Sequence, residues 1–202
     1  MNQKIQYLRE KLKAKNIDGM IISNPNNILY LTNLHAEGML LLTKKENIFL
    51  TDSRYIEEAN NTLTISDGII VANVRDYTSD DYENFFMFCE NVGIEENHLK
   101  YAQYQNIQYT YKCNNLVETE NVIEEMRAIK DEEEIGNIRK ACEITDKCFE
   151  YLLKFIKKGK KEKDIAFEIE TFFRRNGAED VAFKPIVASR VKCFKTACNT
   201  NR

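Results

Sequence analysis

Few side chains in this sequence are of the kinds that perform covalent or metal chemistry. Its 202 residues include two histidines, His35 and His98, and six cysteines, at positions 89, 113, 142, 148, 193 and 198. The cysteines form no C-x-x-C pair and no Cys/His set with zinc-site spacing, so we expect free thiols that are mostly small core residues. The sequence also lacks a phosphate-binding loop, an H-E-x-x-H motif and a G-x-S-x-G motif. We therefore identify no catalytic residue and no metal ligand.

The acidic run from Asp131 to Glu134 is the one stretch that could suggest a cation site. Consecutive helix residues point in different directions around the axis and cannot converge on one ion. Asp131 followed three residues later by Glu134 is instead the pattern of a capping box, and acids are favoured at the positive end of a helix dipole. The run predicts a helix N-terminus.

Arg54 and Tyr55 lie where a predicted strand passes into a predicted helix. One interpretation is a structural salt bridge beside a core aromatic, and the other is a contact with a dimer partner or a pocket. His35 and His98 are interpreted first as surface or partly buried polar residues. The basic run over residues 157–163 is interpreted as a solvated helix end and turn.

Strands and helices alternate up to about residue 127. Strands are expected at 20–22, 39–43, 48–51, 69–72, 100–102 and 116–118, with 39–51 forming a hairpin and 69–72 buried. Helices are expected after a cap at Asn2, at 28–32, after Asp52 or Ser53, after Ser79 or Asp80 with an end at Gly93, and at 107–111 and 120–126. This alternation predicts an α/β domain with a mixed sheet over residues 1–127.

A long amphipathic helix opens the second part, residues 128–202. Its apolar residues recur at spacings of three and four: Ile135, Ile138, Cys142, Thr145, Phe149, Leu152 and Ile156. A second helix is expected over 161–176 and a strand over 182–187, where Pro185 favours an edge or irregular position. Residues 190–202 carry four cations, no acid and no clear period. Two helices and one strand leave apolar stripes uncovered, so we expect an incomplete domain whose remainder is absent.

Composition excludes several classes of protein. Hydrophobic content of 43% and charged content of 30% are those of a soluble globular protein, and the net charge of −3 gives no general attraction to nucleic acid. No apolar run approaches the ~20 residues that span a bilayer. The charged, periodic N-terminus is unlike a signal peptide. We expect a cytoplasmic protein that binds neither nucleic acid nor membrane.

Four strings, in their order and spacing, resemble the creatinase/prolidase/aminopeptidase P family, and bacterial Xaa-Pro aminopeptidases and dipeptidases in particular. The strings are ISNPNNILYLT at 22–32, LTDSRY at 50–55, RAIKDEEEI at 127–135, and GAE at 177–179 with FKPIVAS at 183–189. The resemblance implies a creatinase/prolidase-type N-terminal domain over 1–127, with a mixed β-sheet flanked by helices. It also implies an incomplete α+β pita-bread domain over 128–202, with two helices and a strand.

The resemblance further implies a substrate and a cofactor. Family members release an N-terminal residue that precedes proline, and they use two manganese or cobalt ions. The X-Pro bond is a tertiary amide without an N–H, and two metals can activate water and polarise its carbonyl without one. The family's metal ligands come later than any position of this chain, so none is carried over and the chain alone is expected to be inactive.

Two further expectations follow from the resemblance. In dimeric relatives the loop that contains His35 faces the neighbouring subunit's pocket, so His35 would be a substrate-gating contact in trans. This implies a homodimer, or a heterodimer with a full-length paralogue, and the alternative function is a non-catalytic binding or dimerisation module of that kind. After Ser189 the chain departs from the family pattern, whereas residues 197–202 resemble it again. We interpret the segment near 190–199 as translated out of frame or diverged, a hypothesis that sequencing the locus would test.

Overall fold

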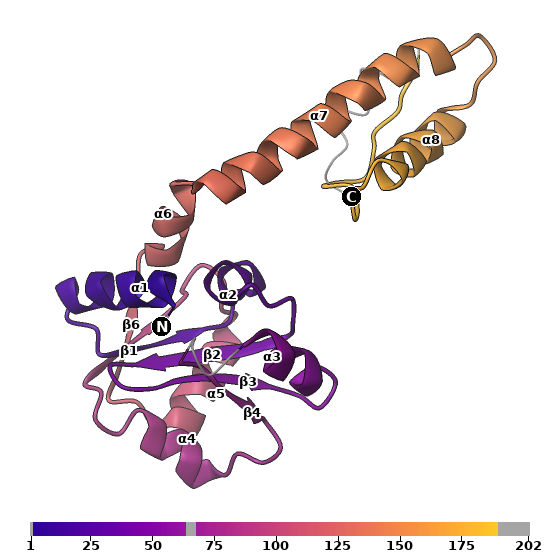
Figure 1. Ribbon diagram of the computed structural model, residues 1–202. Helices are drawn as coiled ribbons and strands as arrows, with labels where there is room; N and C mark the ends of the chain where they lie inside the picture. Colours follow the sequence, from indigo (N-terminus) through magenta and orange to yellow (C-terminus); the bar gives the residue numbers. More distant parts are fainter. Residues whose placement is uncertain (1, 64–67, 190–202) are drawn as a thin grey trace. The chain divides into compact units, whose positions relative to one another are not determined.

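The computed structural model describes residues 2–63 and 68–189, and the chain divides into two compact units (Figure 1). The first unit is Met1–Ile129 and the second is Lys130–Arg202, a division two residues beyond the expected boundary at 127. Within the described residues no helix is both long and apolar enough to cross a membrane. The two units are described separately below.

The first unit is built on a six-stranded mixed sheet with the order β4-β3-β2-β1-β5-β6. The strands are β1 (Gly19–Ile22), β2 (Gly38–Thr43), β3 (Asn47–Thr51), β4 (Ile70–Asn73), β5 (Asn91–Ile94) and β6 (Asn115–Glu118). The pairs β1–β2 and β2–β3 are antiparallel, whereas β1–β5, β3–β4 and β5–β6 are parallel. The expected mixed sheet and its 39–51 hairpin are confirmed.

Helices cover both faces of this sheet (Figure 1). They are α1 (Gln3–Ala14), α2 (Pro25–Thr32), α3 (Ile56–Thr62), α4 (Ser79–Phe85), α5 (Tyr101–Tyr111) and α6 (Val122–Ala128). Alternation along β1 shows why two cores form: Met20 and Ile22 pack with α1, α2, α3 and α6, whereas Ile21 packs with residues of α5 and with Phe86, which follows α4. The sheet therefore has a hydrophobic core on each side.

One stretch of the first unit differs from the sequence prediction. The aromatic helix α4 does not reach Gly93, because residues 91–94 form β5 between β1 and β6. Gly93 suits this crowded position, since a Cβ there would lie 2.6 Å from Cγ2 of Thr119. The expected strand at 100–102 is also wrong, because Tyr101 begins α5.

Smaller corrections concern edges and caps. Strand β4 is an edge strand rather than a buried one, and Ile70 is 58% exposed. Helix α3 follows Tyr55 with no side-chain cap, because the Asp52 carboxylate binds Arg54 instead. Helix α4 is capped by Thr78 rather than by Ser79 or Asp80. The Asn2 cap of α1 is confirmed, since its Oδ1 accepts the amides of residues 4 and 5.

The second unit contains two helices, α7 (Glu132–Phe155) and α8 (Glu162–Arg175). The predicted capping box is confirmed, because Asp131 Oδ1 accepts the Glu134 amide at 2.8 Å and Glu134 Oε2 accepts the Asp131 amide at 3.0 Å. The helices meet where the Tyr151 ring stacks on Phe172 at 5.1 Å and the Tyr151 hydroxyl donates to Glu168 Oε1 at 2.9 Å.

Large apolar side chains remain exposed in this second unit. Phe149 and Leu153 on α7 are 64% and 66% exposed, and Phe167 on α8 is 68% exposed. The strand expected at 182–187 does not form. These residues are irregular, since the described part of the second unit contains no strand to pair with them and Pro185 has no amide hydrogen. The expectations for residues 190–202 lie outside the described residues.

Candidate functional site

A polar cluster forms where β3 ends beside the start of β2. The antiparallel register places Thr51 opposite Gly38, and the Thr51 hydroxyl donates to the carbonyl oxygen of Glu37 at 2.6 Å. This register brings the loop over residues 33–37 next to the segment 52–55. We call Glu37, Asp52, Arg54 and Tyr55 the β2–β3 rim cluster.

Arg54 is the centre of the β2–β3 rim cluster. Its Nη2 donates to Asp52 Oδ2 at 2.7 Å and to Glu37 Oε2 at 3.0 Å, and its backbone amide donates to Asp52 Oδ1 at 2.8 Å. The guanidinium carbon lies 5.1 Å from the centre of the Tyr55 ring. The hydrogen bonds from Arg54 lower the pKa of Asp52 and raise that of Arg54, so both stay charged at neutral pH.

The chemistry available at this cluster is recognition rather than catalysis. The side chains of Arg54 and Glu37 are 64% and 73% exposed, and surface ion pairs of this kind stabilise a fold only weakly. His35 is exposed and forms no hydrogen bond or ion pair with any described residue. The structure thus joins Arg54 to Tyr55, and joins Arg54 through Glu37 to the loop of His35, without a direct contact to the imidazole.

A buried polar network holds in place helix α2, which leads into the 33–37 loop. Sequence reasoning missed this network. Glu95, 6% exposed, follows β5 and accepts the backbone amides of Ser23 at 2.6 Å and Asn24 at 2.7 Å. These amides lie at the N-terminus of α2, where a carboxylate is favoured. Recognition of a strand at 91–94 would have placed Glu95 directly after that strand, beside the end of β1.

Asn27 extends the network to α6. Its fully buried amide nitrogen donates to Glu95 Oε1 at 2.6 Å and to Glu124 Oε1 at 2.7 Å. Its oxygen accepts from Arg127 Nη1 at 2.9 Å. The network therefore fixes α2, and with it the 33–37 loop, to β5 and α6. Its groups satisfy one another and position the loop rather than offering a reactive atom.

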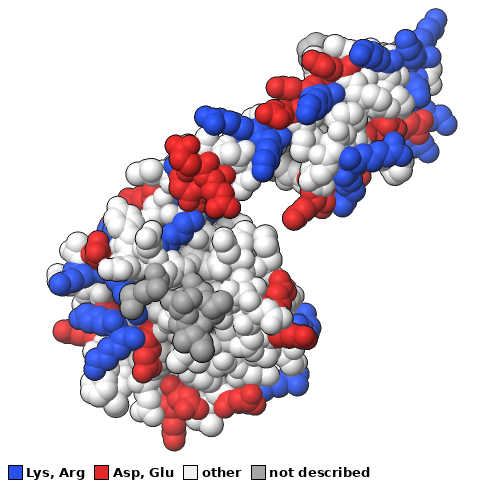
Figure 2. All heavy atoms as spheres, viewed as in Figure 1, with Lys and Arg blue, Asp and Glu red and all other residues white. Residues whose placement is uncertain are grey.

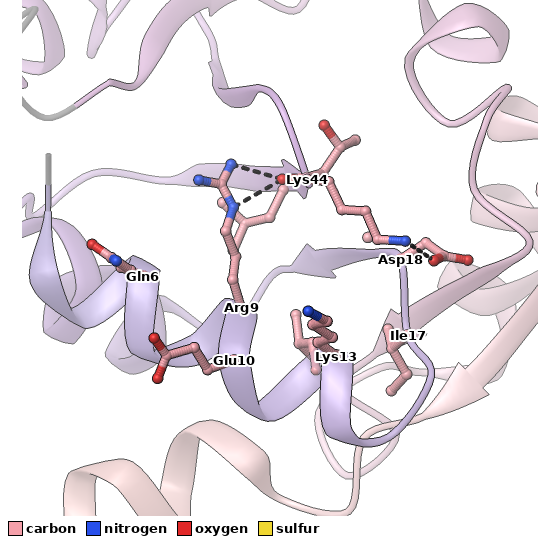
Figure 3. Close-up of a pocket in the computed structure, with 11 residues that line it drawn as sticks. Gln6, Arg9, Glu10, Lys13, Ile17, Asp18 and Lys44 are labelled. Carbon is pink, nitrogen blue, oxygen red and sulfur yellow. Dashed lines mark hydrogen bonds and ion pairs between the residues drawn. The ribbon is translucent and has the colours of Figure 1, made fainter.

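A surface pocket of about 500 Å³ lies between α1 and the β1–β2 pair (Figure 3). Arg9 reaches across it and donates through Nε and Nη2 to the Thr43 carbonyl, at 2.9 and 2.7 Å. Lys44 pairs with Asp18 at 2.5 Å on the other side. Arg9, Lys44 and Asp18 are thus engaged with protein groups, and the pocket shows no arrangement of nucleophile and base.

A further kind of site would be a set of side chains, among the described residues, that could bind a metal ion. No group of three or more His, Cys, Asp or Glu among the described residues could hold an ion. The acids at the start of α7 serve its capping box. The donor set described here therefore does not fit the pair of ions that the sequence resemblance implies.

Two family models match consecutive parts of the chain. The creatinase/prolidase N-terminal domain matches residues 4–129, and metallopeptidase family M24 matches residues 136–195.

The individual relatives that match this chain are peptidases as well. An uncharacterised peptidase of Bacillus subtilis, YqhT, is 30% identical over 194 residues, which are 94% of this chain and 54% of that protein. An Xaa-Pro dipeptidase of Pyrococcus horikoshii is 29% identical, over 94% of this chain and 52% of its own length. The solved Xaa-Pro dipeptidase from Bacillus anthracis has a TM-score of 0.81 at 28% identity, over 90% of this chain and 51% of that one. The chain spans about half the length of the curated relatives it matches.

Proposed function

Because the chain belongs to the creatinase/prolidase family, we propose that it forms the N-terminal domain and the start of the catalytic domain of an Xaa-Pro peptidase. The observation that carries this is the order of the two family matches, at 4–129 and 136–195, over the two units of the structure. Proline-containing peptides are the proposed substrates, and two manganese or cobalt ions the proposed cofactors of the complete enzyme.

The 202 residues alone do not turn over such peptides. The chain covers about half of its relatives, and the described residues offer no ligand set for a metal. The test is release of proline from an Xaa-Pro dipeptide by the purified chain, with added Mn²⁺ or Co²⁺ and a full-length Xaa-Pro dipeptidase as the positive control. Turnover by the 202-residue chain itself would refute the proposal of inactivity.

The role of the first unit is to present the 33–37 loop and the β2–β3 rim cluster to the catalytic pocket of a neighbouring subunit. His35 is exposed there, and Arg54 is held in one orientation by Glu37 and Asp52. His35→Ala and Arg54→Ala, made in a full-length relative with the same two residues, are expected to raise KM for the dipeptide. Glu57→Ala on exposed α3 is the control and should leave KM unchanged. Equal KM for all variants would contradict this role.

A second candidate function is a non-catalytic module that binds a full-length paralogue. The exposed apolar side chains of α7 and α8 favour it, because they form a surface suited to another polypeptide. Affinity purification of the tagged chain from its own cells, with mass spectrometry of what is retained, tests the idea. Retention of an Xaa-Pro peptidase is the expected result, and its absence would reject this candidate.

A further inference from the structure

Two cysteines of the first unit occupy equivalent positions in neighbouring segments of the chain. The parallel register of β5 and β6 pairs Asn91 with Asn115. Two residues further back along both segments, Cys89 on one side corresponds to Cys113 on the other. The topology of the sheet therefore places two thiols side by side, just before the paired strands begin.

Hydrogen bonds show that the two segments are still adjacent at the cysteines. The Asn115 amide donates to the Glu90 carbonyl oxygen at 3.2 Å, and Nδ2 of Asn114 donates to the Cys89 carbonyl oxygen at 3.5 Å. Adjacent strands lie about 4.8 Å apart. Disulfides join residues whose Cα atoms are roughly 4.4–6.8 Å apart. The spacing of these two segments is thus one that a disulfide can span.

Both thiols belong to the same hydrophobic core, on the face of the sheet that α4 and α5 cover. Cys89 is 5% exposed and lies in this core, and the partly buried Cys113 packs against it. Val92 and Leu116, three residues further along each segment, belong to it as well. Both cysteines are free thiols in the structure. Their proximity is set entirely by contacts within the first unit.

We propose that Cys89 and Cys113 form a reversible intrachain disulfide by exchange with a small-molecule disulfide such as oxidised glutathione. The partly exposed Cys113 loses its proton and attacks one sulfur of the oxidant, which releases one glutathione. Cys89 then loses its proton and attacks the Cys113 sulfur, and the second glutathione leaves. The protein gives up two electrons and two protons, which are recovered in two molecules of reduced glutathione.

The bond would close a ring of chain that contains the whole of β5 and α5. Glu95, which accepts the amides of Ser23 and Asn24 at the start of α2, also lies in this ring. A ring of this kind restricts the unfolded chain and so stabilises the folded one. Oxidation should therefore raise the thermal midpoint of the first unit by about 10 °C.

The surroundings of the two thiols make the exchange slow at neutral pH. Burial, followed by the charge of the neighbouring Cys89, raises the pKa of the Cys113 thiol to about 11. Burial and then the Asp18 carboxylate raise the pKa of Cys89. Figure 2 shows acidic side chains at the end of the first unit where α4 lies, and the first turn of α4 holds Asp80 and Asp81. Negative charge there also slows the approach of anionic glutathione.

Peptide mapping of the full chain tests the bond directly. The purified protein is held below its thermal transition in glutathione buffers of increasing oxidised fraction, and free thiols are then alkylated in denaturant. The expected product is a linked Cys89–Cys113 peptide that dithiothreitol separates. The proposal is overturned if both thiols stay free at every ratio, or if either one ends joined to glutathione or to a different cysteine.

Matched variants connect the bond to stability. Cys89→Ala and Cys113→Ala should each lose the linked peptide and the rise in thermal midpoint, whereas Cys142→Ala, at an exposed position of α7, should keep both. If Cys89→Ala does not fold, the partly exposed Cys113 site decides the question alone. A midpoint that oxidation leaves unchanged or lowers in the wild type, or raises equally in Cys113→Ala, would overturn the proposal.

The pH dependence of the exchange gives an independent readout. Because the thiolate is the attacking species and both pKa values are raised, the rate of bond formation should increase about tenfold per pH unit above neutrality. A rate that does not change with pH would contradict attack by these buried thiols. None of these measurements involves peptidase activity, so their failure is distinguishable from failure of the proposed function.

Discussion

The buried carboxylate of Glu95 is expected to contribute measurably to the stability of the first unit. Its Oε2 accepts the amides of Ser23 and Asn24, at 2.6 and 2.7 Å, and its Oε1 accepts the Asn27 side chain at 2.6 Å. Glu95→Gln has nearly the same shape but one oxygen. If that oxygen keeps the two backbone amides, the new NH₂ group faces the NH₂ of Asn27, donor against donor.

Asn27 cannot turn its amide over to relieve this conflict, because its oxygen accepts from Arg127 at 2.9 Å. The variant therefore loses at least one hydrogen bond to a charged group and leaves a buried donor unpaired, a cost of about 1.5–3 kcal/mol. At about 4 °C per kcal/mol for a unit of this size, the thermal midpoint should fall by about 6–12 °C.

Urea denaturation and hydrogen exchange would measure this loss. Since 1.36 kcal/mol corresponds to a factor of ten, the amides of Ser23 and Asn24 should exchange about 10- to 150-fold faster. Glu96→Gln is the matched control, because the Glu96 carboxylate accepts the Thr119 amide at 3.0 Å and a Gln oxygen can do the same. If Glu95→Gln is no more destabilising than Glu96→Gln, the network does not anchor α2 as described.

Three further predictions address packing and charge. Gly93→Ala should destabilise the first unit by about 1–3 kcal/mol, because the added Cβ would lie 2.6 Å from the Thr119 methyl group. Gly136→Ala has open space around it and should stabilise α7 by up to about 1 kcal/mol. Thermal unfolding midpoints in the opposite order would contradict both predictions. The Tyr111 hydroxyl is buried without a hydrogen-bond partner in the described structure, and burial raises the pKa of its phenol; Tyr111→Phe should therefore be neutral or stabilising in urea, and a loss above ~1 kcal/mol would indicate a hidden partner. The hydrogen bond from Lys44 lowers the pKa of Asp18. The stability that this pair adds is therefore present above the ordinary pKa of ~3.9 and is lost as pH falls through the lowered pKa. NMR titration of the Lys44→Met variant should show a higher pKa for Asp18 than in the wild type, and an unchanged pKa would reject the pairing.

Local signals predicted much of this fold. The Asn2 cap, the 39–51 hairpin and the capping box at Asp131 are all encoded within a few neighbouring residues, and all three are confirmed. Strand β5 was missed because Asn91-Val92-Gly93-Ile94 has little β character on its own; its burial comes from β1 and β6 on either side. Helix α5 was missed at its start because Tyr101 is 75% exposed and gives no apolar period.

The candidate site was predictable only in part. Arg54 and Tyr55 are adjacent in sequence, so their association follows from the chain itself. The contact of Arg54 with Glu37 depends on the register of β2 against β3, which no local pattern reports. The functional roles of His35, Arg54 and Tyr55 remain predictions, to be decided by the KM measurements above.

The central position of β1 has a consequence during synthesis. Its β2 neighbour leaves the ribosome soon after it, but its other neighbour, β5, begins only at Asn91. At 5–20 residues per second, the intervening stretch of about 70 residues takes roughly 4–14 s to translate. For that interval the nascent sheet has an open, apolar edge in Met20, Ile21 and Ile22, so the half-made first unit should be a substrate for chaperones that act on emerging chains.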